Sequence, residues 1–273
     1  MVTLSVCLET VFTDLPAEQR IGKIREAGFD TVEFWHPEGT WDGHTVRTGW
    51  AKDAGSLRGA AEQYEIAIND FALHAWDGSL GGCPVRPADR GTYLEQVRRM
   101  IAFAHRIGCR KGITLSGTAA PGLSRSQMRA SLEQALAEAA EIARRENFTL
   151  LLEPLNTLVD HPAYYLDSTA EAAEVIRGIA SPHLELLYDV YHMQIMEGKV
   201  LATIEKHVDI IGHFHAAGVP GRGELFDGEL NYPRILRHIE SLGYRGAFGL
   251  EYFPKRSDHM ESLQRTRAYL RGE

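Results

Sequence analysis

The chain has 273 residues, of which 44% are hydrophobic and 24% are charged, a composition typical of a globular protein rather than a disordered one. Acidic residues outnumber basic residues by 37 to 29, and the formal net charge of -8 opposes non-specific attraction to phosphate backbones. We therefore expect an enzyme that acts on a small molecule and binds no nucleic acid.

The cysteines and the opening segment indicate where such a protein would be found. Cys7, Cys83 and Cys109 form no C-x-x-C pair, so we expect neither a disulfide framework nor a thiolate zinc site. The opening segment MVTLSVCLETVF predicts a buried strand rather than a signal peptide. No apolar run approaches the roughly 20 residues of a membrane helix. These features predict a cytoplasmic protein with no membrane partner.

Short apolar segments, rich in β-branched, leucine and aromatic residues, recur along the whole chain and predict strands. In chain order they are 2–8, 30–35, 66–74, 109–116, 147–153, 184–189, 209–215 and 246–252.

Amphipathic segments between these strands predict helices. The first follows the cap signal Asp14-Leu15-Pro16 and ends at Gly28, and the second covers 89–108. A third covers 125–145, with Ser124 as its cap. The last two are one that contains Ile235, Leu236 and Ile239 and ends at Gly243, and a terminal helix from residue 257.

The alternation of strands and helices predicts a parallel sheet, because parallel neighbours need crossover connections. Eight such units in this length indicate a closed (β/α)8 barrel, the TIM barrel. An open doubly wound sheet is the main alternative, but no G-x-G-x-x-G motif follows the first strand. No linker interrupts the pattern, so residues 1–273 are expected to form a single domain. The Gly/Pro-rich loops 76–90 and 216–230 follow strands, on the barrel face that carries active sites.

Four polar residues occupy the ends of the last four predicted strands: Glu153, Asp189, His215 and Glu251. The carboxyl ends of barrel strands meet at one mouth, where three carboxylates would repel one another and lose hydration. A bound divalent cation is the simplest compensation, with Mn²⁺ or Mg²⁺ first and Co²⁺, Zn²⁺ or Fe²⁺ as alternatives. A single such residue is more often an ordinary strand-end polar group, but four on consecutive strands favour a shared metal site.

Further polar residues surround this mouth. His192 lies three residues after Asp189 and could reach back over it, whereas His213 shares the face of His215 deeper in the barrel and suits a core histidine. Arg222, in the loop VPGRGE, has a guanidinium that could bind a substrate carboxylate, although a solvated loop arginine is the plainer interpretation.

Two residues on earlier strands extend this set. Glu33 and His74 end the second and third predicted strands and could line the opposite wall, and a helix cap or structural hydrogen bond suits either equally well. His161, a few residues beyond Glu153, is also placed to reach the pocket.

Several longer motifs make the chain recognisable. It resembles the hydroxypyruvate isomerase family, part of the xylose-isomerase-like group of barrels to which sugar epimerases also belong. The resemblance covers most of the chain and is densest from 147 to 254. It rests on LEPLN (152–156), DHPAYYLDS (160–168), LLYDVYHMQIMEG (186–198), GHFHAAGVPGRGEL (212–225), GELNYPRIL (228–236) and GLEYFP (249–254).

The resemblance implies roles for individual residues. Glu153, Asp189 and Glu251 match metal-binding positions, and the two glutamates double as the acid/base pair. His192 and Arg222 match substrate-contacting positions. Apart from the resemblance, His74 and Asn156 are also expected to bind substrate. The resemblance also implies a dimer or tetramer.

His215 departs from the family pattern, because hydroxypyruvate isomerases usually carry glutamine there and ketose 3-epimerases carry a histidine ligand. The loop 76–88 also has no close match in the best-known members.

Together with these residues, the resemblance implies a metal-dependent isomerase that transfers a proton through a cis-enediolate, converting hydroxypyruvate to tartronate semialdehyde. A ketose 3-epimerase or another sugar isomerase with the same metal site is the alternative, which His215 favours. A DNA-repair nuclease with a related barrel is disfavoured by the net charge, and a catalytically silent barrel is disfavoured by the presence of both glutamates.

Overall fold

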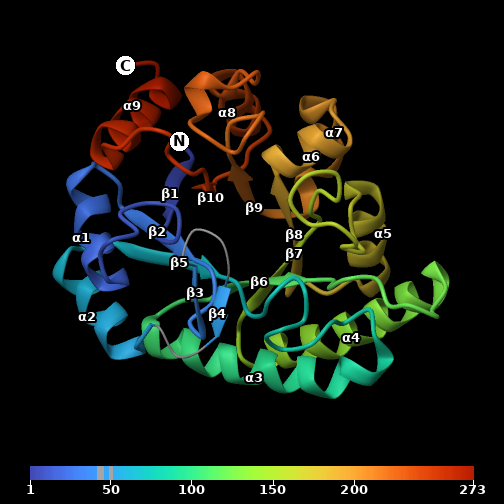
Figure 1. Ribbon diagram of the computed structural model, residues 1–273. Coiled ribbons are helices and arrows are strands. Elements are labelled where there is room, and N and C mark those ends of the chain that lie inside the picture. The colour runs from blue at the N-terminus through green and yellow to red at the C-terminus, as the bar shows by residue number, and fades with distance from the viewer. Residues whose placement is uncertain (42–45, 49–51) are drawn as a thin grey trace.

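The computed structural model describes residues 1–41, 46–48 and 52–273, and its centre is a barrel of eight parallel strands (Figure 1). The strands lie in the order β5-β2-β1-β10-β9-β8-β7-β6. The two ends of this order meet, because Ala72 and Ile113 form a parallel bridge and the Leu73 N–H donates to the Ile113 carbonyl at 2.9 Å. The predicted (β/α)8 barrel is therefore confirmed.

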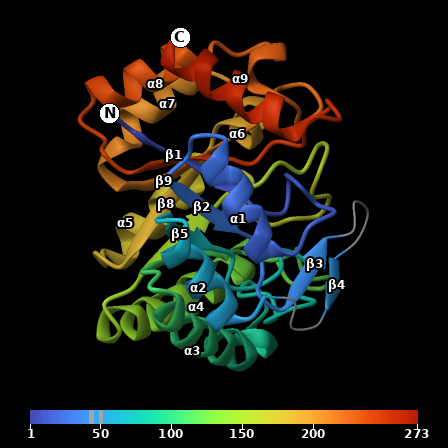
Figure 2. The ribbon, with the colours of Figure 1, turned by 90° about the vertical axis from the view of Figure 1, so that its left-hand side faces the viewer.

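All eight predicted strands are present. They are β1 Thr3–Cys7, β2 Thr31–Phe34, β5 Ala67–Phe71, β6 Lys111–Leu115, β7 Thr149–Glu153, β8 Leu184–Asp189, β9 Ile211–Ala216 and β10 Ala247–Leu250. An antiparallel hairpin of β3 Gly39–Trp41 and β4 Val46–Thr48 stands beside the barrel (Figure 2) and was not predicted. Its strands have three residues each, too few to show an alternating pattern.

Helices cover the outside of the barrel (Figures 1 and 2). The five predicted helices correspond to α1, α3, α4, α8 and α9, and Ser124 forms the predicted cap of α4 in a capping box with Gln127. Among the described residues, no helix is both long and apolar enough to cross a membrane. The helix bounds are α1 Ala17–Glu26, α2 Ala54–Gln63, α3 Arg90–Ile107, α4 Arg125–Arg145, α5 Thr169–Ile179, α6 Val190–Met196, α7 Val200–His207, α8 Tyr232–Ser241 and α9 His259–Arg271.

The two-residue alternation of the strands separates the barrel interior from the helical layer. On β7, Leu151 and Glu153 point into the barrel, in register with Ile113 and Leu115 of β6. Leu152 points the other way, toward the helices, and is fully buried. Glu153 therefore reaches the barrel mouth from a strand that is packed on both faces.

We predict that Leu152→Ala lowers the free energy of unfolding by about 2–5 kcal/mol, because it leaves a cavity between the sheet and the helices. Denaturant unfolding measures this change. Leu158→Ala is the control, since Leu158 is 70% exposed, and it should shift stability by less than about 0.5 kcal/mol. Equal stability of the two variants would contradict the described packing.

Candidate active site

Four of the predicted residues converge at the carboxyl ends of neighbouring strands. Asp189 ends β8 in register with His215 of β9, Glu153 ends β7, and Glu251 directly follows β10. The His215 Nδ1 lies 3.3 Å from Glu153 Oε1 and 3.7 Å from Glu251 Oε2. Donor atoms of Asp189, His215 and Glu251 all lie within 4.8 Å of one another. All four side chains are buried, with exposed fractions of 1–6%.

The electrostatics of this cluster show how strongly its negative charges interact. Burial, together with the charge of Glu153, raises the pKa of the Asp189 carboxyl to about 7. Burial also raises the pKa of the Glu153 carboxyl, although the adjacent imidazole of His215 opposes the rise. At Glu251, burial raises the pKa, but the charges of Arg222 and His215 outweigh it and the pKa falls below its usual value. The pKa is therefore raised at Asp189 and Glu153 and lowered at Glu251, the carboxylate that pairs with Arg222.

The donor atoms fit a divalent cation. Within the described part of the chain, neither ring nitrogen of His215 makes a well-aligned hydrogen bond, although both are buried. Donors that each lie about 2.1 Å from one ion are about 3.0–3.4 Å apart, close to the separation of His215 from Glu153. Carboxylate oxygens with one imidazole are a donor set suited to Mn²⁺, Mg²⁺ or Co²⁺. Glu153, Asp189, His215 and Glu251 are the residues that would hold the ion.

His192 lies beside this cluster in a fixed orientation. Its Nδ1 accepts from the side-chain amide of Asn156 at 2.6 Å, so its Nε2 carries the proton and faces Asp189 Oδ2 at 3.5 Å. Asn156 is fully buried, and its side-chain oxygen accepts the backbone N–H groups of Val159 and Asp160. The structure thus places Asn156 behind His192, where it orients the imidazole.

Arg222 covers the cluster from the loop that follows β9. Its guanidinium pairs with Glu251, and its charged end lies 5.3 Å from the centre of the Tyr191 ring and 5.8 Å from that of Phe253. The indole N–H of Trp35 donates to the other oxygen of Glu251. Arg222 has a positive φ of 54°, which is uncommon for a residue with a side chain and often marks functional sites.

Of the two predicted wall residues, Glu33 lies beside His215 and His74 lies elsewhere. The His74 Nε2 accepts the Leu115 N–H at 3.0 Å and lies 3.1 Å from Thr114 Oγ1, and its ring packs against Tyr93. These contacts tie His74 to β6 and α3 rather than to the four converging residues. The predicted third strand extended to residue 74, but β5 ends at Phe71, so His74 lies beyond the strand end.

Two further features of the site were missed by sequence reasoning. Trp76, from the loop after β5, packs on His161 with 4.8 Å between ring centres, and His161 packs on His192 at 5.4 Å. Asp70 faces the barrel interior and joins a deeper cluster with Glu33 and His213. The two-residue alternation was the signal for Asp70, because positions 70 and 74 lie on the same face of the predicted strand.

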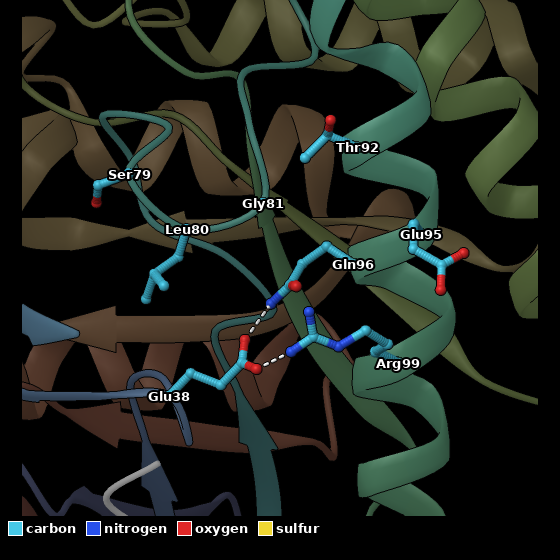
Figure 3. A pocket seen from close by; sticks show the side chains of 8 residues that line it. All are labelled: Glu38, Ser79, Leu80, Gly81, Thr92, Glu95, Gln96 and Arg99. Atoms are coloured by element: carbon cyan, nitrogen blue, oxygen red, sulfur yellow. Dashed lines mark hydrogen bonds and ion pairs between the residues drawn. The ribbon is translucent and has the colours of Figure 1, made fainter. Parts of the chain in front are cut away.

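A separate hollow of about 650 Å³ lies between the loop after β5 and α3 (Figure 3). Its buried carboxylate, Glu38, accepts from Gln96 at 2.8 Å and pairs with Arg99, so its charge is already neutralised. It contains no predicted site residue. Its lining residues are Glu38, Ser79, Leu80, Gly81, Thr92, Glu95, Gln96 and Arg99.

Known proteins are similar to this chain over most of its length. Residues 21–271 match the model of the family described as xylose isomerase-like TIM barrel. The chain is 30% identical to a protein of Escherichia coli named hydroxypyruvate isomerase, over 93% of this chain and 95% of the relative. It is 34% identical to a 2-oxo-tetronate isomerase of Cupriavidus necator, with 84% of each chain covered.

A solved structure shares the fold. A protein of Brucella melitensis, described as AP endonuclease, family 2, superimposes with a TM-score of 0.88 at 28% identity, covering 98% of this chain and 99% of the other. The family model covers more than nine-tenths of the chain, and the relatives in sequence are named isomerases. The chain therefore belongs to the xylose isomerase-like TIM barrel family and is an isomerase.

Proposed function

We propose that this chain is a divalent-metal-dependent isomerase that interconverts a small hydroxy-keto compound and its aldehyde isomer. Hydroxypyruvate and tartronate semialdehyde are the proposed pair. The observation that carries the proposal is the convergence of Glu153, Asp189, His215 and Glu251 at the mouth of the barrel. The names of the relatives support the substrate class.

The proposed reaction moves one proton between adjacent carbons. A glutamate, Glu153 or Glu251, removes the proton from C3 of hydroxypyruvate, and the other returns a proton to C2 of the cis-enediolate. The hydroxyl proton on O3 moves to O2, and the two glutamates recover their starting protonation states by exchange with solvent before the next turnover. A divalent cation, when bound, stabilises the negative charge that develops on the two substrate oxygens. Atoms balance without a redox partner, because the substrate and the product are isomers.

Two other side chains are proposed to bind the substrate. The Nε2–H of His192, fixed by Asn156, is oriented to donate to a substrate oxygen near Asp189. The guanidinium of Arg222 offers several N–H donors in one plane and would exchange part of its contact with Glu251 for the substrate carboxylate. Both residues act by holding the substrate rather than by transferring its proton.

A ketose 3-epimerase is the second candidate, and His215 is the observation that favours it, because hydroxypyruvate isomerases usually carry glutamine at that position. The same pair of glutamates would then remove and return a proton on a single carbon. The name of the Brucella melitensis protein raises a nuclease as a third candidate. The net charge of -8 opposes binding to a phosphate backbone.

We predict that Glu153→Gln and Glu251→Gln each lower turnover of hydroxypyruvate by at least about 10²-fold, because each removes a proton-transfer group. NMR detection of deuterium uptake from D₂O measures the proton transfer directly. Glu185→Gln is the control, since Glu185 lies on β8 four residues before Asp189, away from the mouth. Turnover close to wild type in both mouth variants would rule out the acid/base assignment.

Metal removal gives a second prediction. Chelation should abolish turnover and lower the melting temperature, and added Mn²⁺ or Mg²⁺ should restore both. A ligand at 100 times its Kd stabilises the folded state by about 2.7 kcal/mol, which corresponds to several degrees for a chain of this size. Elemental analysis after purification without chelators gives the stoichiometry. Full activity in chelated, metal-free protein would contradict the proposal.

The position of Trp76 predicts substrate size. Trp76 and His161 stack beside His192, so they should restrict the length of the bound substrate. We expect Trp76→Ala to raise kcat/KM for six-carbon ketoses relative to hydroxypyruvate by roughly tenfold. Leu158→Ala, an exposed change in the same loop as His161, is the control. An unchanged ratio in Trp76→Ala would show that this wall does not select the substrate.

A further inference from the structure

A second buried cluster lies deeper in the barrel, next to the proposed metal ligands. It consists of Glu33 of β2, Asp70 of β5 and His213 of β9, and it shares His215 with the cluster at the mouth. Donor atoms of all four lie within 4.8 Å of one another, and the exposed fractions of the side chains are 0–2%. Neither the acid/base pair nor the substrate contacts account for two carboxylates at this depth.

His213 bridges the two inner carboxylates. Its Nε2 lies 3.1 Å from Glu33 Oε2 and 3.3 Å from Asp70 Oδ2, which are hydrogen-bond distances for an N–H shared between two acceptors. The side-chain amide of Asn69 donates to the same oxygen of Asp70. One oxygen of each carboxylate is therefore held by protein donors.

The other oxygen of Glu33 faces the metal ligand His215. Glu33 Oε1 is buried, makes no well-aligned hydrogen bond within the described residues, and lies 3.2 Å from His215 Nε2. The opposite ring nitrogen, Nδ1, faces Glu153 and Glu251. The imidazole of His215 thus connects the inner carboxylate to the outer cluster, with one nitrogen turned toward each.

Gly249 of β10 leaves room for the carboxylate of Glu33 to lie close to the imidazole of His215. It pairs in register with His215, and a Cβ atom at this position would lie 2.2 Å from Glu33 Oε1 and 2.7 Å from His215 Cδ2. Both distances are shorter than real Cβ contacts allow. Any side chain at position 249 would therefore have to separate Glu33 from His215.

We propose that Glu33 is a positioning residue that accepts the Nε2–H of His215 and holds its Nδ1 toward the divalent cation. His213 and Asp70 hold Glu33 in place for this task. The proposal rests on the proposed function, because it requires a cation at the mouth. A histidine whose N–H has a fixed partner presents its other nitrogen as the metal ligand, and metal binding makes that N–H a stronger donor.

The same four residues could instead hold a second cation, because their donor atoms also have the spacing of ligands around one ion. The two arrangements differ in stoichiometry. A positioning role requires one ion per chain, held at the mouth. A second site requires two ions, one of which depends on Glu33 and Asp70.

The test uses the full chain with Co²⁺ as the probe, since Co²⁺ reports on its ligands through its visible absorption. Titrations of wild type, Glu33→Gln and Gly249→Ala give affinity, stoichiometry and spectrum, and thermal melts of the metal-free proteins report folding. Glu185→Gln is the matched control, because it makes the same chemical change on the interior face of β8 near Gly212, outside both clusters.

We expect Glu33→Gln and Gly249→Ala to weaken Co²⁺ binding by about 10–100-fold and to change its absorption spectrum, with one ion per chain in wild type. Unchanged affinity and spectrum in a folded Glu33→Gln would overturn the positioning role. Two ions in wild type and one in Glu33→Gln would overturn it in favour of a second cation site.

The titration also distinguishes this inference from the proposed function. Absence of Co²⁺ binding in wild type would overturn both, whereas binding that Glu33→Gln leaves unchanged would overturn this inference alone. If Glu33→Gln does not fold, Gly249→Ala decides, because it separates Glu33 from His215 without removing a charge.

Discussion

The mutual repulsion of buried carboxylates at the barrel mouth is the constraint on which the site depends. Glu153, Asp189 and Glu251 are fixed at the ends of packed strands, so they cannot relieve the repulsion by moving apart. The pKa of Asp189 reaches about 7 because of this burial and the neighbouring charge of Glu153. Arg222 and His215 offset part of this negative charge, and the proposed cation would offset more of it.

The sequence predicts the barrel well because its strands are apolar runs bounded by turn residues. This pattern can be recognised without knowledge of the tertiary structure. It also predicts the four converging residues, since a polar residue lies at or next to the end of each of β7, β8, β9 and β10. It does not reveal the end of β5, because the apolar character continues past Phe71 to Leu73. The pattern therefore places His74 at the mouth. Contacts such as that of Trp76 with His161 depend on loop conformation, which no periodicity encodes.

Family membership and site geometry constrain different levels of the function. Relatives matched over most of the chain are named isomerases, which fixes the class of reaction. Under the proposed function, the choice between a three-carbon acid and a ketose would depend on the walls beside the four converging residues, where Trp76, His161 and Arg222 lie. His215 offers a nitrogen donor among carboxylates, which would favour transition metals such as Mn²⁺ and Co²⁺ over Mg²⁺ in the proposed site.

The placement of the proposed ion ligands on strands, or directly at their ends, has an evolutionary consequence. Glu153, Asp189 and His215 belong to strands, whereas Trp76 and Arg222 belong to the loops that follow β5 and β9. Descendants of such a barrel can change these loops by insertion or recombination and so acquire new substrates. The strand residues proposed to hold the ion are then kept unchanged. This division between strand residues and loop residues explains how one ancestral barrel could give rise to enzymes that act on small acids and enzymes that act on sugars.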